Sequence, residues 1–298
     1  PFFTGQFCGI SKFGSGMLFD KIHKFVERCG SKIKLNEKIS HFLQRNGRLI
    51  EIHTSKSSYK VSRDDLVVST LPVTTMAKLS GFDCNLNFRG ILSLYASFTG
   101  VNQVLPQGYD WLYFADKSIF NRITEPTKLS NSMNLGRSDR TYIICENNVD
   151  SNSARSWSSE DIEDITSKAV NDLHQIDFLK KFALDQTAYN LEPYVYPVQT
   201  HANKVIYKEA LSSLMKIINL ECIGTGANYE YNDMQVIFKQ AKELALDLSS
   251  GNINGDLRMS TFASYSQDEF NKNSDISTGL SQKVEIIAEI GINHNGSH

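Results

Sequence analysis

Two glycines near the carboxyl-terminal third of the chain constrain the fold most. Gly224 and Gly226 lie between a short apolar run that ends at Ile223 and a helical pattern that reaches Leu248. Glycine permits the tight turn between a strand and a helix. The start of a helix presents unpaired N–H groups and the positive end of its dipole. The sequence therefore predicts a strand, a glycine turn and a helix beginning near Asn232, a geometry that suits a phosphate or a polarised ring carbonyl.

Three earlier segments accompany this turn. They are residues 13–22 (FGSGMLFDKI), residues 32–39 (KIKLNEKI) and residues 67–72 (VVSTLP). In this order the four segments resemble the second half of an FAD-dependent amine oxidoreductase. That family includes monoamine oxidases, protoporphyrinogen oxidases, phytoene desaturases and, more distantly, UDP-galactopyranose mutase. The resemblance covers roughly residues 13–248.

The resemblance implies that FAD is the cofactor. A strand at residues 32–39 would pass the adenine, with Ile39 binding it through the backbone. The glycine turn would lie beside the cofactor, and the helix after it would point at the isoalloxazine ring. The cofactor-binding candidates of this segment are Gly224, Thr225, Gly226, Asn232, Asp233, Met234 and Gln235. Many relatives of the mutase-like branch have Arg where Thr225 stands, which leaves the subfamily open.

A hallmark of the family is missing from the sequence. The family opens with a strand and a GxGxxG turn that holds the FAD pyrophosphate, and no such turn occurs in this chain. We therefore expect a piece of a larger enzyme without its amino-terminal Rossmann unit. The expected fold class is α/β: a partial FAD-binding Rossmann-like domain, an inserted antiparallel α+β substrate domain, and the first strand of a truncated β/α barrel.

The end of the chain supplies the barrel prediction. Residues 283–298 begin with an apolar β-branched run and end in polar side chains, as a first barrel strand does at its catalytic mouth. This stretch resembles the amino terminus of sialic acid (N-acetylneuraminate) synthases. The resemblance places Glu289, Asn293 and His294 at the barrel mouth. One strand confers no activity, because a barrel needs about 250 residues.

The predicted domains follow from these motifs. They are residues 1–73 (partial FAD-binding domain), 74–215 (substrate domain), 216–248 (closing strand, turn and helix), 249–282 (linker) and 283–298 (start of the barrel). Local patterns predict a helix at 15–29 ending at Gly30, strands at 32–35, 39–43 and 49–53 with a hairpin turn at Asn46-Gly47, and a strand at 67–69.

Aromatic strands mark the substrate domain. Strands are predicted at 91–99, 111–114, 141–146 and 182–191, with a capped helix from Ser158 to about His174. Candidate pocket residues are Tyr109, Trp111, Tyr113, Arg122, Tyr194 and Tyr196, although aromatic residues on strands are more often sheet core. Arg122 in an apolar strand needs a carboxylate or an anionic ligand, and Glu125 is one candidate partner.

Composition excludes several classes. Lysine and arginine total 31 and aspartate and glutamate 33, a net charge of −2, so nothing favours nucleic acid as a partner. The sequence has no apolar run of membrane-spanning length, and we expect a cytoplasmic protein. Five scattered cysteines predict neither a disulfide framework nor a zinc site, and Cys222 is read as a small buried hydrophobe. His174 and His201 are expected at the surface or at helix ends, with no metal.

These observations leave three functions open. The first is hydride transfer from a substrate C–N or C–C bond to the flavin, fused to a synthase-like domain of a sugar or cell-surface polysaccharide pathway. The second is a flavin-dependent mutase or modifier of a nucleotide sugar. The third is a non-catalytic binding module attached to an N-acetylneuraminate synthase. The partner in each case is a small molecule such as a sugar or nucleotide sugar, and the motifs identify no catalytic acid or base and no oligomeric state.

Overall fold

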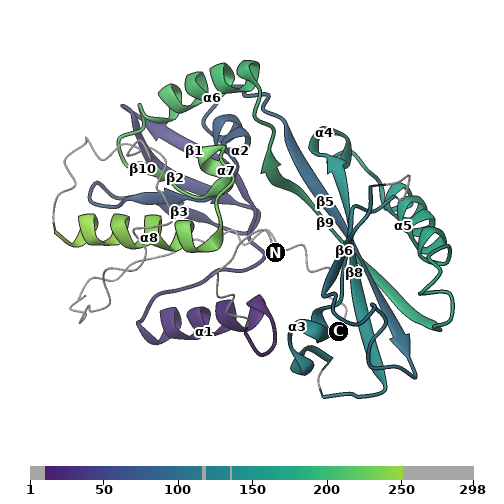
Figure 1. The fold of residues 1–298 in the computed structure, drawn as a ribbon. Coiled ribbons are helices and arrows are strands. Elements are labelled where there is room, and N and C mark those ends of the chain that lie inside the picture. The colour runs from purple at the N-terminus through teal and green to yellow at the C-terminus, as the bar shows by residue number, and fades with distance from the viewer. Residues whose placement is uncertain (1–10, 116–118, 135, 251–298) are drawn as a thin grey trace. The chain divides into compact units, whose positions relative to one another are not determined.

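The computed structural model describes residues 11–115, 119–134 and 136–250, and it divides into two compact units (Figure 1). Unit 1 contains the described residues of Pro1–Cys29 and Phe88–Val195. Unit 2 contains those of Gly30–Asn87 and of Tyr196–Gly291. The predicted barrel strand with Glu289, Asn293 and His294, and almost all of the predicted linker, lie outside the described residues.

Unit 1 is built on a five-stranded sheet. Its strands are β5 (Phe88–Thr99), β6 (Trp111–Tyr113), β7 (Arg122–Thr124), β8 (Arg140–Asp150) and β9 (Leu184–Pro197), in the order β6-β7-β8-β5-β9. The β5–β8, β6–β7 and β7–β8 pairs are antiparallel, as the aromatic-rich sequence predicts. Buried and half-buried residues alternate along β5 and β8, because successive side chains of a strand point to opposite faces.

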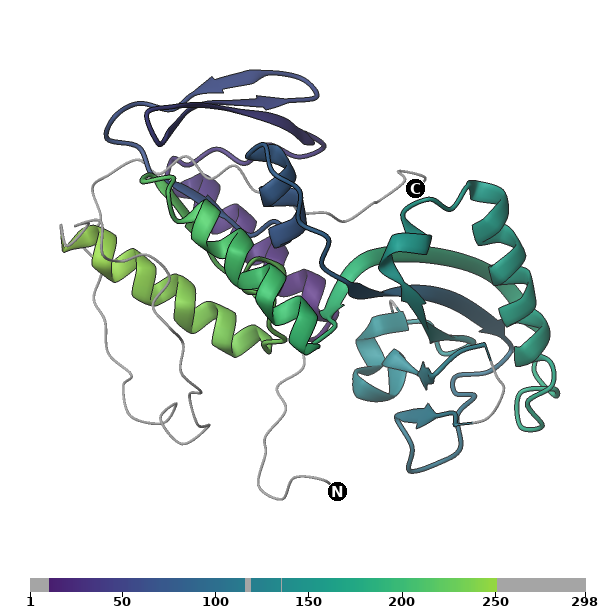
Figure 2. The same cartoon turned by 90° about the horizontal axis from the view of Figure 1, so that it is seen from above.

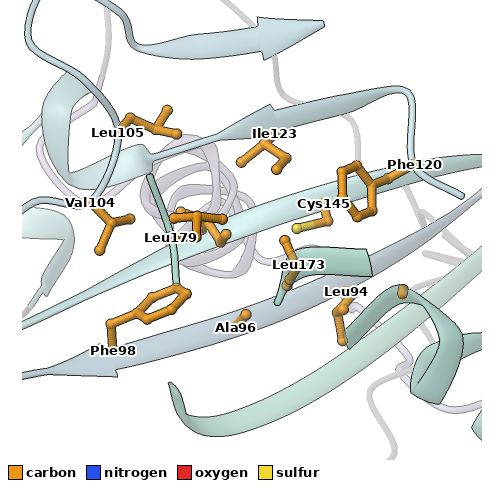
Figure 3. Packing of buried hydrophobic residues seen from close by; sticks show 12 residues of the cluster. Leu94, Ala96, Phe98, Val104, Leu105, Phe120, Ile123, Cys145, Leu173 and Leu179 are labelled. Carbon is orange, nitrogen blue, oxygen red and sulfur yellow. The ribbon is translucent and has the colours of Figure 1, made fainter. Parts of the chain in front are cut away.

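One face of this sheet carries the core of unit 1. Helix α5 (Ser159–Leu173) lies along that face (Figure 2), and its Ala169 and Leu173 pack with Leu94, Ile123 and Ile143 of the strands. Figure 3 shows the apolar side chains that fill this space, which include Phe120 and Cys145. The predicted capping box is confirmed, because Ser158 and Asp161 exchange hydrogen bonds at the start of α5.

Shorter helices complete unit 1. They are α1 (Ser15–Arg28), α3 (Pro126–Leu129), the 3-10 turn η1 (Asn131–Asn134) and α4 (Ser151–Ala154). Helix α1 ends just before Gly30, whose φ of 83° lies in the left-handed region, as the capping prediction requires. The other face of the five-stranded sheet is lined by half-buried side chains and is described with the functional site.

Unit 2 contains two smaller sheets. Strands β1 (Ile39–Arg45), β2 (Arg48–Thr54) and β3 (Ser58–Lys60) form an antiparallel meander, and β4 (Val67–Ser69) pairs in parallel with β10 (Leu220–Cys222). The predicted hairpin turn is confirmed: Asn46 and Gly47 have φ of 52° and 72°, the two positive values of a type I′ turn. The helices are α2 (Val73–Leu79), α6 (His201–Leu214), α7 (Thr225–Asn228) and α8 (Met234–Ser249).

One predicted strand of unit 2 is wrong. Residues 32–35 form no strand, and β1 begins only at Ile39. Asn36 has a φ of 58°, a left-handed conformation that interrupts the extended run between the two segments. The alternation of lysine with isoleucine and leucine at 32–35 is therefore not a pairing pattern. Within the described residues, none of the helices combines the length and apolar character that crossing a bilayer requires.

Candidate functional site

The parallel strand pair of unit 2 brings two predicted motifs together. Val67, Val68 and Ser69 of β4 align with Leu220, Glu221 and Cys222 of β10, and the Ile223 N–H donates to the Ser69 carbonyl at 2.9 Å. Both strands therefore end at the same edge, where one continues into residues 70–72 and the other into the glycine turn. The carboxyl ends of parallel strands are the usual place for a ligand in an α/β fold.

The two glycines of the turn have different roles. Gly224 has φ 94° and ψ 167°, a region that is nearly restricted to glycine, and an added Cβ would meet no atom within 4 Å. Gly226 permits close packing instead, because its Cβ would lie 3.2 Å from Pro72 Cα. The open space beside the Gly224 backbone is where a ligand can approach the main chain. Gly226 joins the turn to the segment that follows β4.

The turn leads first into a short helix. The four-residue helix α7 follows Gly224, and α8 begins only at Met234 with Asp233 as its N-cap. The predicted start of the long helix, Asn232 to Gln235, is confirmed. The prediction that a glycine turn joins the strand directly to that helix needs correction, since α7 and the residues up to Asp233 intervene.

Tyr229 fixes this intervening segment. It adopts a left-handed conformation with φ 49°, and its side chain is buried. Its hydroxyl oxygen lies 2.7 Å from the carbonyl oxygen of Asn87 and 2.8 Å from that of Val198, either of which can accept its hydrogen, and it accepts a hydrogen bond from Asn203 Nδ2 at 3.1 Å. The Tyr207 ring stacks on it at 5.7 Å. Sequence reasoning missed Tyr229, because nothing in its local pattern distinguishes an anchoring tyrosine from an exposed one.

The start of α8 has unused hydrogen-bonding capacity. The Asp233 carboxylate makes no capping bond to the helix backbone and instead accepts from Gln235 Nε2 at 3.3 Å, and the first turn contains no acidic residue. The Asn232 carbonyl accepts from Thr225 Oγ1 at 3.3 Å, while Asn232 Nδ2 is buried without a hydrogen-bond partner among the described residues. A buried donor of this kind is costly unless something accepts its hydrogen bond.

These features fit the flavin that the sequence motifs imply. A ring carbonyl could accept from Asn232 Nδ2 or from the free N–H groups at the start of α8, and Gly224 leaves the main chain accessible. Asp233 is the one charged side chain in this set, and its carboxylate is directed to Gln235. These hydrogen-bond donors would therefore suit the polar edge of an uncharged ring.

Ile39 is placed apart from this set. It is the first residue of β1, pairs with Thr54 of β2, and is half-buried. Across the described part of unit 2, no hydrogen bond joins Ile39 to the residues of the glycine turn. Its predicted contact with adenine remains a prediction.

Three of the predicted pocket residues lie together in unit 1. Tyr113 of β6 faces Arg122 of β7, and Arg122 faces Glu146 of β8. Arg122 Nη2 lies 2.6 Å from Glu146 Oε1, and Nη1 lies 3.5 Å from the Tyr113 hydroxyl. Burial lowers the pKa of Arg122 and the Glu146 hydrogen bond raises it, with a net shift upward, so the guanidinium stays charged. Trp111 lies on the same face, opposite Thr124.

The predicted partnership of Arg122 with Glu125 is wrong. Glu125 is fully buried and accepts hydrogen bonds from the N–H groups of Val104 (2.9 Å) and Leu105 (2.8 Å) and from Thr141 Oγ1 (2.7 Å). Arg122 and Glu125 are three positions apart on an extended segment, so their side chains point to opposite faces. Glu125 holds the loop before β6, and Glu146 is the carboxylate that Arg122 needs.

The other three pocket candidates do not join this cluster through any contact of the described residues. The Tyr194 hydroxyl accepts from Arg155 Nη1 at 2.9 Å, and its ring meets Phe88 edge to face at 5.3 Å. The Tyr196 ring contacts Tyr231 at 5.2 Å within unit 2. Tyr109 is 55% exposed on the loop before β6.

Two tyrosines that the sequence analysis did not select share the face of Arg122. Tyr95 lies opposite Ile144, the neighbour of Thr124, and Tyr142 lies opposite Ser97. Burial raises the pKa of the Tyr95 hydroxyl, and the Glu146 charge adds to the effect; burial likewise raises the pKa of Tyr142. Both hydroxyls therefore remain protonated donors. The alternation of β5 and β8 could have revealed them, had the face opposite the core been traced.

Cys222, His174 and His201 lie where the sequence predicts them. Cys222 is buried, and burial raises the pKa of its thiol to about 12, as expected of a small hydrophobe. His174 is the C-cap of α5 and His201 the first residue of α6, both at helix ends. The described residues contain no cluster of three metal-ligating side chains.

Solved structures with a similar fold come from the family that the motifs resemble. A reduced UDP-galactopyranose mutase matches with a TM-score of 0.53 at 15% identity, over 68% of this chain and 44% of that one. A provisionally assigned protoporphyrinogen oxidase from Exiguobacterium sp. 255-15 matches with 0.55 at 16% identity, over 75% and 48%. A putrescine oxidase variant matches with 0.50 at 10% identity, over 80% and 53%.

At this identity the likeness shows the fold alone. The chain has a mixed α/β fold with antiparallel sheets that resembles part of these flavin-dependent oxidoreductases and mutases. It spans about half the length of the structures it matches. No protein-family model matches the chain, and no curated protein matches its sequence.

Proposed function

We propose that this chain supplies the flavin-ring and substrate portions of an FAD-dependent oxidoreductase that oxidises a substrate C–N or C–C single bond by moving a hydride from its carbon to the flavin. The observation that carries the proposal is the edge of unit 2 where the glycine turn follows β10. There Gly224 leaves the main chain open, Asn232 Nδ2 has no partner, and α8 begins without a side-chain cap.

The residues of this edge would bind and orient the cofactor. Asn232 Nδ2 and the N–H groups of Met234 and Gln235 are donors that can meet ring carbonyl oxygens. Tyr229 holds these donors in place through its buried hydroxyl contacts. The bound flavin supplies the redox chemistry by accepting the hydride, while the protein supplies orientation and electrostatics. No described side chain is assigned as the acid or base.

Ring binding can be tested without turnover. Flavin fluorescence should be quenched saturably when the chain is titrated into lumiflavin, which is the ring system without ribityl phosphate. Asn232→Leu should weaken this binding about tenfold, since one buried hydrogen bond contributes about 1.4 kcal/mol. Asn148→Leu, an exposed asparagine of unit 1, is the matched control and should bind like the wild type. Equal affinity of Asn232→Leu and wild type would contradict the proposal.

A second candidate is a redox-neutral, flavin-dependent mutase or modifier of a nucleotide sugar. The similarity in fold to a UDP-galactopyranose mutase supports it, as does the sequence resemblance of residues 283–298 to sialic acid synthases. Charge argues against a diphosphate near Arg122, because Glu146 already neutralises that side chain at 2.6 Å. A substrate that bleaches the flavin anaerobically distinguishes the oxidoreductase from the mutase.

The third candidate is a non-catalytic binding module for the synthase-like segment. It predicts that a protein complete in both flavin-binding halves still takes up no flavin. Uptake of flavin by such a protein would exclude it.

A further inference from the structure

The face of the five-stranded sheet opposite the core is organised in rows. Residues directly opposite each other in an antiparallel pair share a face, so the registers define each row. The first row contains Tyr113, Arg122, Glu146 and Ser93, and the second contains Trp111, Thr124, Ile144 and Tyr95. Tyr142 and Ser97 form the third. We call these ten residues the aromatic face.

The charges beside the aromatic face are already paired. Arg122 binds Glu146 at 2.6 Å, and Arg140, at the end of the face, binds Asp185 at 3.2 Å. Each arginine therefore already has a carboxylate partner through Nη, and only its buried Nε has no hydrogen-bond partner among the described residues. Glu146 is likewise engaged, which removes the one carboxylate in the rows that could hold an ammonium group. A charged ligand group would lose its hydration here without gaining an opposite charge.

The remaining groups are ring faces and hydroxyls. Trp111 is 49% exposed and Tyr113 70% exposed, unusual values for such large side chains on strands. The same face carries the hydroxyls of Ser93, Thr124 and Tyr142, one in each row. A wholly apolar ligand would leave these hydroxyls without partners. A ring with apolar C–H faces and hydroxyl edges can satisfy both the aromatic planes and the hydroxyls.

We propose that the aromatic face binds an uncharged, polyhydroxylated ring such as a pyranose. The proposal deepens the proposed function, on which it rests for treating unit 1 as the substrate-binding part. Arg122 acts in it as a positioning residue: it holds Glu146 through an ion pair and lies 5.9 Å from the centre of the Tyr113 ring. Arg122 thereby keeps the side chains of Glu146 and Tyr113 in place.

The test uses Trp111 as the reporter in the full chain. The chain contains two tryptophans, so Trp157→Phe leaves Trp111 as the one fluorophore of its kind. This protein is titrated with methyl glucoside, with inorganic pyrophosphate and with 1,4-diaminobutane. We expect a saturable change in emission with methyl glucoside and none with the two charged probes. Flavin is absent from the assay, so the result is independent of whether the flavin proposal holds.

Two tyrosine variants distinguish a loss of glucoside binding from a loss of folding. Tyr142→Phe keeps the ring and removes one hydroxyl, and it should weaken glucoside binding about fivefold, which corresponds to one hydrogen bond of about 1 kcal/mol. Tyr231→Phe, at an exposed tyrosine of unit 2, is the matched control and should bind unchanged. Saturable binding of pyrophosphate or of the diamine, no saturation with methyl glucoside, or equal losses in both tyrosine variants would each overturn the proposal.

Discussion

The two units differ in how many of their buried polar groups have hydrogen-bond partners. Unit 1 has a five-stranded sheet, a helix packed on one face, and a buried carboxylate, Glu125, with three donors. Unit 2 contains a two-stranded parallel sheet of three residues each, and four buried polar atoms without partners in the described chain. These atoms belong to Thr74, Ser80, Asn232 and Gln240, whereas the described part of unit 1 contains two such atoms, Nε of Arg122 and Nε of Arg140.

This difference has a physical basis. An antiparallel sheet can cover one face with its own helix and expose the other, whereas parallel strands in known folds belong to larger sheets that are covered on both faces. Val68 of β4 is accordingly 38% exposed. The chain covers 44% and 48% of two solved structures with this fold. We therefore expect unit 1 to be the more stable unit and unit 2 to gain most from a ligand.

The largest effect is expected in the core of unit 1. Phe120 is 1% exposed and lies in the apolar cluster of Figure 3. Phe120→Ala should lower the free energy of unfolding of unit 1 by about 3–5 kcal/mol, since it removes a buried ring and leaves a cavity. Urea unfolding followed by tryptophan fluorescence measures this change, because both tryptophans, Trp111 and Trp157, lie in unit 1. Phe25→Ala on α1, where the side chain is 64% exposed, is the control in the same unit and should change little. A similar loss at both sites would contradict the assignment of Phe120 to the core.

The second-largest loss of stability is expected at the glycine turn. Gly224→Ala should destabilise unit 2 by about 1–3 kcal/mol, because alanine is strained at φ 94° even with open space around it. Gly226→Ala should act through a contact with Pro72 instead. In thermal unfolding, Gly224→Ala should lower the Tm of unit 2 and leave unit 1 unchanged. A Tm equal to that of the wild type would show that the turn does not require glycine.

Alkaline pH should weaken unit 2 through Cys222. Burial raises the pKa of its thiol from 9.0 to about 12, so the unfolded chain loses the proton first as pH rises. The stabilising contribution is complete below about pH 9 and is lost as pH approaches 12, with a slope of about 1.4 kcal/mol per pH unit. Urea midpoints of wild type and Cys222→Ala between pH 8 and pH 10 measure it. The wild type should lose more stability with pH than the variant, and parallel curves would contradict the buried thiol.

The smallest effect concerns the aromatic face. Arg122→Gln should lower the free energy of unfolding by about 1 kcal/mol, because the Glu146 carboxylate, which is 22% exposed, would lose its ion-pair partner. The double variant Arg122→Gln, Glu146→Gln should recover most of this loss. A double-mutant cycle by urea unfolding gives the coupling free energy, and a value of zero would mean that the pair contributes nothing.

The sequence predicted the parts of the fold that depend on local signals. The Asn46-Gly47 turn, the capping box at Ser158 and the start of α8 all follow from short-range chemistry. The false strand at 32–35 and the mistaken partner of Arg122 depend on long-range pairing instead. Glu146 follows Arg122 by 24 positions, and only the register of β7 with β8 brings them together.

The residues of the candidate site divide in the same way, into those that local sequence signals predict and those that depend on long-range contacts. Glycines at 224 and 226 are visible in the sequence because few other residues permit a turn of this kind. Tyr229, Tyr95 and Tyr142 could not be selected, since a tyrosine in an apolar strand or turn has the same local pattern whether it anchors, lines a site or fills a core. Their roles follow from the carbonyls, carboxylates and strands that the fold places beside them.

The most direct test of the account compares lumiflavin and FAD as ligands of this chain by fluorescence quenching. The structure offers donors for the flavin ring, whereas the sequence contains no GxGxxG turn for the pyrophosphate. We predict weak, saturable binding of both compounds with affinities within about threefold of each other, and an affinity about tenfold weaker for both in Asn232→Leu. FAD binding that is far tighter than lumiflavin binding, or lumiflavin binding that does not depend on Asn232, would contradict the assignment of this edge to the flavin ring.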